Sequence, residues 1–274
     1  MAQNSVYNDP SPARSLADVR ANSNRYSSNK STRPGRGAVY GNVGGYSRRL
    51  ARKNSWQMFA SGVALAAIVV VLLWTGALAT PGKHFTLLVI GGIGAVVALY
   101  GYQTSHVAWR KAAVGYRSEA RVARVLAGMG SEVLLNGTLL GAGGDADHII
   151  LGPVAAVIET KTGHGHVQAS TDGRIIAGGR PIPKNPVSQV NRQARALHQI
   201  AGVYVDSVVC VVDMTDRPFS VHGATVCSLA DLPSVLSSLP SRIGGNQARA
   251  LANTLAERSK AEQLKLDAQR AARR

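Results

Sequence analysis

Two acids and a lysine lie close together in the segment GDADHIILGPVAAVIETKTGHG, residues 144–165. Asp147 precedes Glu159, and Lys161 follows Glu159 with a single residue between them. Hard cations such as Mg²⁺ take carboxylate oxygens as ligands, together with water and phosphate oxygens. A lysine beside such an ion can position an attacking water and offset negative charge on a phosphate. These side chains have the types needed to hydrolyse a phosphodiester, although an ordinary hairpin with a charged surface has the same composition.

The spacing predicts that the acids meet on a β-hairpin. Side chains alternate along a strand, so Glu159 and Lys161 share one face whereas the Thr160 side chain points away. A turn at Gly152-Pro153 would pair Asp147 with about position 158, next to Glu159. The two acids are therefore candidate ligands of Mg²⁺ or Mn²⁺, and the backbone carbonyl of Thr160 could supply a further oxygen.

The elements that must position these residues predict an α/β domain over residues 113–240. A helical pattern in AVGYRSEARVARVLAGMG is followed by three β-prone runs and by a hairpin signal at Thr171-Asp172-Gly173. Asn185-Pro186 is typical of a helix start, and VDSVVCVVDM is typical of a buried central strand. A short strand and a helix from Asp231 follow. We expect a mixed central sheet flanked by helices.

Three pieces of this domain resemble the nuclease-related domain, NERD, a branch of the PD-(D/E)XK nuclease-like superfamily. They are GYRSEARVARVL, GDADHIILGPVAAVIETKTGHG and NPVSQVNRQARAL, in that order. The resemblance implies a restriction-endonuclease-like sheet and metal-dependent cleavage of nucleic acid, with DNA foremost. It also implies that Asp147, Glu159 and Lys161 form the catalytic core, supported by Glu119 on the first helix and Gln189 on a later one.

Two uncharged apolar runs precede the domain and predict a transmembrane hairpin over residues 56–103. Residues 56–80 and 85–102 contain no charged side chain, and a membrane-spanning helix needs about 20 such residues. Trp56 and Trp74 suit positions near the membrane interface. A pair of helices buried in a protein core is the alternative interpretation.

The charged flanks of these runs predict the topology. Residues 1–55 carry ten Lys and Arg against two Asp and have the composition of a disordered segment. Their last basic cluster, Arg48, Arg49, Arg52 and Lys53, is placed to contact anionic lipid headgroups. Basic residues also follow the second run, so the positive-inside rule places the N-terminus and the α/β domain in the cytoplasm of a bacterial-type inner membrane. Residues 241–274 are expected to form a basic helical tail that is solvated.

The net charge of +16 favours a polyanionic partner, which is either nucleic acid or an anionic lipid surface. Three functions remain open from the sequence. The protein is a membrane-anchored nuclease, a membrane-held module that binds nucleic acid without cutting it, or a membrane scaffold. Cys210 and Cys227 lie in apolar runs and are expected to be buried free thiols, which fits a reducing compartment.

Overall fold

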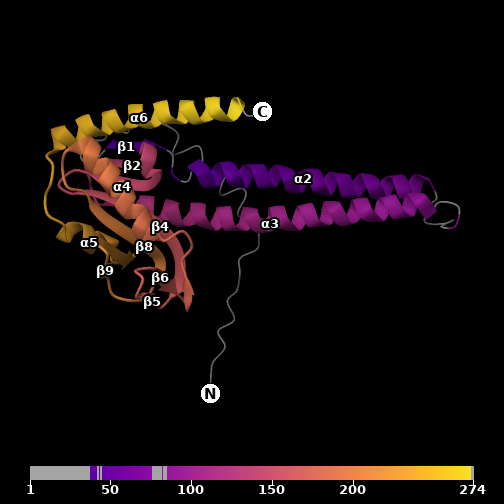
Figure 1. The fold of residues 1–274 in the computed structure, drawn as a ribbon, viewed down its shortest axis with the longest axis horizontal. Coiled ribbons are helices and arrows are strands. Elements are labelled where there is room, and N and C mark those ends of the chain that lie inside the picture. Colours follow the sequence, from indigo (N-terminus) through magenta and orange to yellow (C-terminus); the bar gives the residue numbers. More distant parts are fainter. Residues whose placement is uncertain (1–37, 42, 44, 76–81, 83–84, 273–274) are drawn as a thin grey trace, which may run out of the picture.

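The computed structural model shows an α/β domain from which a pair of long helices projects (Figure 1). It describes residues 38–41, 43, 45–75, 82 and 85–272. The disorder predicted for residues 1–37 therefore lies outside the described residues. The fold class predicted from the sequence is confirmed, because a mixed sheet is flanked by helices and preceded by two apolar ones.

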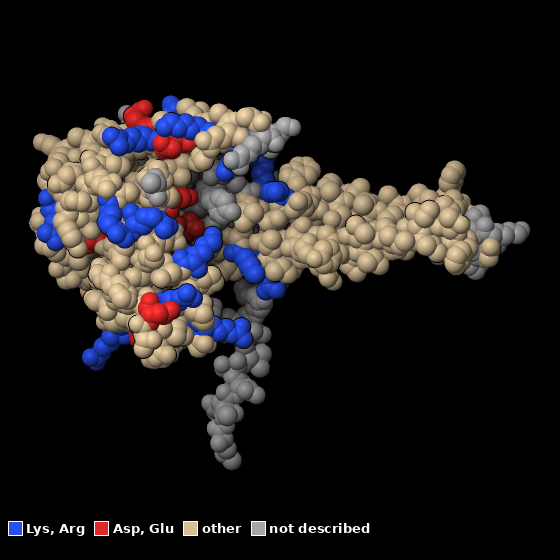
Figure 2. All heavy atoms as spheres, viewed as in Figure 1, with Lys and Arg blue, Asp and Glu red and all other residues tan. Residues whose placement is uncertain are grey.

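The projecting pair consists of α2 (Gly45–Trp74) and α3 (Phe85–Gly128). Both are long and apolar enough to cross a membrane, by length and composition. Large apolar side chains cover their outer surface, and Trp74 is 89% exposed. On the face seen in Figure 2, the described residues of the pair far from the domain show neither basic nor acidic side chains. So large an exposed apolar surface is unfavourable in water and marks a contact with lipid or with a partner.

Glycines of α3 bring the two helices into close contact. A Cβ atom added at Gly94 would lie 3.0 Å from the Ile68 side chain, and one at Gly101 would lie 3.1 Å from the Ser61 hydroxyl. Gly91 packs against Leu72 in the same way. Small residues at such positions let helix backbones approach each other where hydrophobic driving force between helices is weak.

Helix α3 does not stop at the base of the pair. The sequence suggests a hairpin that ends at residue 103 and a separate domain helix from residue 113, yet residues 104–112 are helical as well. This segment, TSHVAWRKA, contains neither proline nor glycine, so nothing in it breaks the helix. One helix of 44 residues therefore connects the apolar pair to the α/β domain.

The end of the predicted disordered segment is ordered. Residues 38–41 form strand β1 (Ala38–Gly41), which pairs in parallel with β2 (Val133–Leu139), and residues 45–55 belong to α2. The prediction of disorder up to residue 55 is thus wrong for these two stretches. The prediction of disorder was based on composition. Residues 38–41 are ordered by hydrogen bonds to a sheet edge distant in the sequence, and residues 45–55 by continuation of the apolar helix.

Seven strands form the central sheet. Besides β1 and β2 they are β3 (Asp145–Leu151), β4 (Ala155–Gly165), β8 (Asp206–Met214), β9 (Phe219–Val221) and β10 (Ala224–Ser228). Their order across the sheet is β1-β2-β3-β4-β8-β10-β9. Strand β4 pairs antiparallel with β3 on one side and parallel with β8 on the other. The central position of β4 places Glu159 and Lys161 in the middle of the sheet.

Helices cover both faces of the sheet. On one face the C-terminal part of α3 and helix α5 (Leu232–Ser238) pack through Leu126 and Leu236. On the other face α4 (Pro186–Ala201) packs through Val190 and Leu197. Alternation along the strands divides the core in two, since Ile158 belongs to the first face and Val157 to the second.

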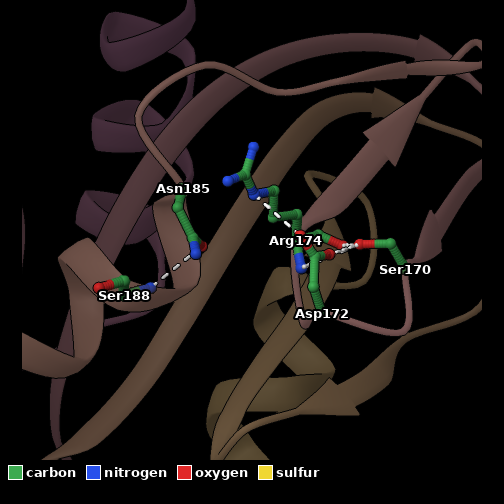
Figure 3. A network of polar contacts seen from close by, with 5 residues as sticks. All are labelled: Ser170, Asp172, Arg174, Asn185 and Ser188. Atoms are coloured by element: carbon green, nitrogen blue, oxygen red, sulfur yellow. Dashed lines mark hydrogen bonds and ion pairs between the residues drawn. The ribbon is translucent and has the colours of Figure 1, made fainter.

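A small antiparallel sheet of β5 (Val167–Ala169), β6 (Ile175–Ala177) and β7 (Arg180–Pro181) links β4 to α4. At its first turn, Asp172 accepts a hydrogen bond from the Ser170 hydroxyl and is paired with Arg174 (Figure 3). The same view shows the start of α4, where the Asn185 side chain accepts a hydrogen bond from the backbone N–H of Ser188 at 3.3 Å. This is the helix start predicted from Asn185-Pro186.

The C-terminal segment forms α6 (Gly245–Ala271), a long helix. Its first half is not solvated as expected, because Ala248, Leu251, Ala252 and Leu255 are buried in the core on the α4 face. The Ser259 hydroxyl also accepts a hydrogen bond from the backbone N–H of Leu139, which lies on β2 past the part that pairs with β1. The α/β domain therefore extends past residue 240, and only the second half of α6 is exposed.

Candidate active site

Strands β3 and β4 bring Asp147 and Glu159 side by side. The last paired residues of the two strands are His148 and Ile158, and continuing this register by one residue places Asp147 opposite Glu159. The register predicted from the sequence was one residue away from this arrangement. Both acids lie on the α4 face, because they alternate with residues of the other face.

The two strands separate just beyond these acids. Strand β3 continues to pair with β2 as far as Asp145, and β4 continues along β8 to Gly165 with a register shift after Lys161. The backbone N–H of Thr160 consequently has no strand partner on the β3 side. It donates instead to Oδ2 of Asp147 at 2.8 Å, so the carboxylate takes the place of a strand carbonyl.

Glu159 is held from two sides. Its side chain is 1% exposed; the Lys161 ammonium donates to Oε1, and the Gln193 amide donates to Oε2 at 3.3 Å. The same amide nitrogen of Gln193 also donates to the backbone carbonyl of Asp145 at 2.7 Å. Helix α4 thus fixes the carboxylate of Glu159 and the start of β3 through one side chain.

A cavity of about 550 Å³ opens where the strands separate. Its lining includes every side chain that the sequence places in the site, namely Glu119, Asp147, Glu159, Thr160, Lys161 and Gln189. Glu119 comes from α3, which covers the opposite face of the sheet, so it reaches the cavity at the gap between β3 and β4. Figure 2 shows acidic atoms recessed in a hollow near the base of the helix pair, with basic side chains beside them.

Gln193 is the site residue that the sequence analysis missed. Gln189, which was predicted, lines the cavity but is only half-buried, whereas Gln193 is fully buried and contacts Glu159. The spacing offers a signal, since Gln193 follows Val190 by three residues and precedes Leu197 by four. A glutamine on the apolar face of a helix must find buried polar partners, and a carboxylate is one.

The acids are electrostatically crowded. Burial raises the pKa of Asp147 well above its ordinary value, and the nearby carboxylates of Glu159 and Glu119 raise it further. Burial also raises the pKa of Glu159, against the lowering effect of the Lys161 ammonium. A cluster of this kind is stabilised by an added cation, because each carboxylate disfavours the ionisation of its neighbour.

The donors present fit a hard divalent cation. Among the described residues, no group of three or more His, Cys, Asp or Glu side chains could hold a metal alone. Mg²⁺, however, is commonly held by one or two carboxylates, with water and phosphate oxygens completing its shell. The N–H and C=O of a strand residue point to the same side, so the Thr160 carbonyl faces the side of Asp147. The buried Oε1 of Gln193 has no hydrogen-bond partner within the described part of the chain, and it offers an acceptor to bound water.

Two histidines near the site have partners outside the cavity. His148 is fully buried on the opposite face of β3, and its Nδ1 lies 2.7 Å from the Asn136 amide oxygen. Burial lowers the pKa of His148 to about 3, so the ring is neutral. His166 is exposed and paired with Asp216. Neither ring lines the cavity.

Two neighbouring strands of a mixed sheet separate here and carry two carboxylates and a lysine. A glutamate and a glutamine from helices enclose these groups. Together these features define a nuclease-like α/β domain. Residues 114–212 match the family model described as the nuclease-related domain, NERD. These residues therefore form a nuclease-related domain of the PD-(D/E)XK-like class, as the motifs predicted. Comparisons with curated proteins and with solved structures give no match.

Proposed function

We propose that this protein is a membrane-anchored, metal-dependent nuclease that hydrolyses phosphodiester bonds of cytoplasmic nucleic acid, with DNA as the leading substrate. The observation that carries the proposal is the convergence of Asp147, Glu159 and Lys161 at one cavity inside a nuclease-related domain. Each of these residues comes from a strand of the rigid central sheet, which suits a site that must hold its geometry.

Asp147, Glu159 and the Thr160 carbonyl are the groups that would hold Mg²⁺ or Mn²⁺. When bound there, such an ion acidifies a coordinated water and polarises the phosphate. The protein itself contributes the rest. Gln193 fixes the Glu159 carboxylate, and Glu119 borders the cavity opposite α4.

Lys161 has a double role in this proposal. Its ammonium contacts Glu159 and is partly exposed, with 21% of the side chain accessible at the cavity. It can therefore turn from Glu159 to a phosphate oxygen, offset the charge that develops there and orient a water for attack. Gln189 at the cavity wall is placed to support the substrate backbone through its amide.

The membrane anchor in this proposal is the α2–α3 pair. Strand β1 precedes α2 and pairs directly with β2, which follows α3. If both helices cross the bilayer, the start of α2 and the end of α3 must therefore lie on the same side of the membrane. The excess of Lys and Arg on both flanks favours the cytoplasm, and Arg52 and Lys53 are exposed at the base of α2, where they could meet anionic headgroups.

Cleavage of DNA by the full chain in detergent tests the nuclease proposal. We expect cutting with Mg²⁺, none with EDTA, and a loss of at least about 100-fold in Glu159→Gln and Lys161→Ala, because the groups act as a unit. Equal cutting by both variants and the parent protein would rule out the assignment. Lys260→Ala, on the exposed half of α6, serves as the control for a lost positive charge.

A second function is favoured by one specific observation. The Lys161 ammonium directly contacts Glu159, which neutralises one of the two carboxylates that a metal needs. A module that binds nucleic acid without cutting it would keep this ion pair permanently. It would show binding that weakens steeply with salt, and no change in thermal stability on addition of Mg²⁺.

A further inference from the structure

The charge at the mouth of the cavity is distributed on one side only. Two basic side chains, Lys184 and Arg192, line the mouth; Lys184 precedes the cap residue of α4, and Arg192 lies in the first half of that helix. The opposite wall, formed by α3, contributes Gly115, Ser118 and Glu119 but no lysine or arginine. Apart from Lys161, which is paired with Glu159, a polyanion entering the cavity would therefore find lining cations only on the α4 side.

Both side chains are exposed and available. Among the residues that the structure describes, neither the Lys184 nor the Arg192 side chain has a hydrogen bond or an ion pair. Lysine and arginine near the acidic floor of a cavity could have paired with it, as Lys161 does with Glu159. Their freedom leaves them able to bind a group brought by a ligand.

The backbone at Lys184 is unusual. Lys184 has φ = +64° and Asn185 has φ = +35°, so two consecutive residues other than glycine are left-handed. Asparagine tolerates this conformation, and Asn185 uses it to cap α4 (Figure 3), but lysine gains nothing from it locally. Strained positions of this kind cluster at functional sites, where the surrounding structure holds them.

The cavity also leaves room for a strand beside the loop before β3. Gly144 lines the cavity with φ = +84°, and a Cβ atom added there would meet nothing within 4 Å. Open space beside a residue without a side chain allows a sugar or a base to approach closely.

We propose that Lys184 and Arg192 hold the phosphates next to the scissile one and so guide the substrate strand along the α4 side of the cavity. The inference rests on the proposed function, because it assigns a substrate path to the same site. Lys184 and Arg192 are positioning residues in it, and the acids and Lys161 remain at the reacting phosphate. Contacts of this kind carry no sequence information, so the substrate preference they give is for a phosphate backbone.

Binding without cleavage tests the inference. The full chain is placed in nanodiscs of zwitterionic lipid with EDTA, and its affinity for a fluorescent single-stranded DNA oligonucleotide is measured by anisotropy at several salt concentrations. We expect Lys184→Asn with Arg192→Gln to weaken binding roughly 5-fold per residue at about 0.1 M salt, and to reduce the slope of log K against log salt by about 0.7 per residue. Asparagine at position 184 keeps the left-handed backbone accessible.

The matched control removes the same charge elsewhere. Arg258→Gln with Lys260→Gln, on the exposed half of α6, should leave the slope unchanged, and Lys184→Arg with Arg192→Lys should restore parental binding. Equal losses in the two charge-removing pairs would overturn the inference, as would absence of binding by the parent. If the parent binds in this manner but never cuts with Mg²⁺, the nuclease proposal fails while the phosphate-guiding role stands.

Discussion

The carboxylate of Asp147 accepts a hydrogen bond from the backbone N–H of Thr160 at 2.8 Å and so closes the gap where β3 and β4 part. One residue thus completes the sheet locally and contributes negative charge to the cavity. The two roles oppose each other in the ionisation of Asp147. The hydrogen bond from Thr160 favours the ionised carboxylate, whereas burial and the neighbouring acids disfavour it.

Asp147→Asn should stabilise the metal-free protein. The pKa of Asp147 is raised on folding, so its contribution to stability is full below its ordinary value of 3.8 and is lost as pH rises through the folded value. An amide keeps an acceptor for Thr160 and never ionises. Thermal denaturation of the full chain in detergent with EDTA should show a gain of about 0.5–2 kcal/mol near neutral pH, shrinking toward about pH 4.

Asp172→Asn is the control for that experiment. Hydrogen bonds from Ser170 and Arg174 lower the pKa of Asp172, so its contribution is present above its ordinary value and lost as pH falls. The substitution should therefore give no gain at neutral pH. A gain equal to that of Asp147→Asn would show that the effect comes from net charge alone.

Mg²⁺ should stabilise the parent protein but not Glu159→Gln. A ligand that binds only the folded state at 100 times its dissociation constant adds about 2.7 kcal/mol to the free energy of unfolding. The increase in melting temperature should also be larger at higher pH, since ionised Asp147 and Glu159 bind the ion. Equal shifts in parent and variant would place the binding of Mg²⁺ at some other part of the chain.

Gln193 and Gln189 should differ in their effect on stability. Gln193→Ala leaves Glu159 and the Asp145 carbonyl without their amide partner in a buried place, so we expect a loss of about 1–3 kcal/mol and much weaker cleavage. Gln189→Ala removes a half-buried side chain and should cost less than about 0.5 kcal/mol. Urea denaturation of both variants measures the difference, and similar losses would contradict the assignment of Gln193 as the buried support.

Where the information is local, the sequence predicts how these side chains are placed. Alternation puts Glu159 and Lys161 on one face, and the short Gly152-Pro153 turn limits where Asp147 can pair, so the register was missed by only one residue. The fold class follows from the succession of helical and β-prone runs. The resemblance to the nuclease-related domain then supplied Glu119, which no local spacing connects to the hairpin.

What the sequence could not predict depends on distant contacts. The order of β1 comes from pairing with β2 across almost a hundred residues, and composition alone reads this stretch as disordered. Likewise, the burial of Leu251 and Leu255 can be predicted only when the sheet that they cover is known. The position of Gln193 on an apolar helix face indicates a buried amide, but its partner Glu159 is identified only when the helix and the strand are placed together.

Labelling of single cysteines should decide the topology. A hydrogen bond with Cys227 and burial raise the pKa of the Cys210 thiol, and both native cysteines are buried, so they should not react in the folded protein. Gly82→Cys, between the two apolar helices, and Ser237→Cys, on α5, each add one exposed thiol. In intact spheroplasts, a membrane-impermeant maleimide should label only Gly82→Cys, whereas lysis should make Ser237→Cys equally reactive. The reverse pattern would place the α/β domain outside the cytoplasm, and labelling of both before lysis would show that the two sites lie on the outer side and that the pair does not span the bilayer.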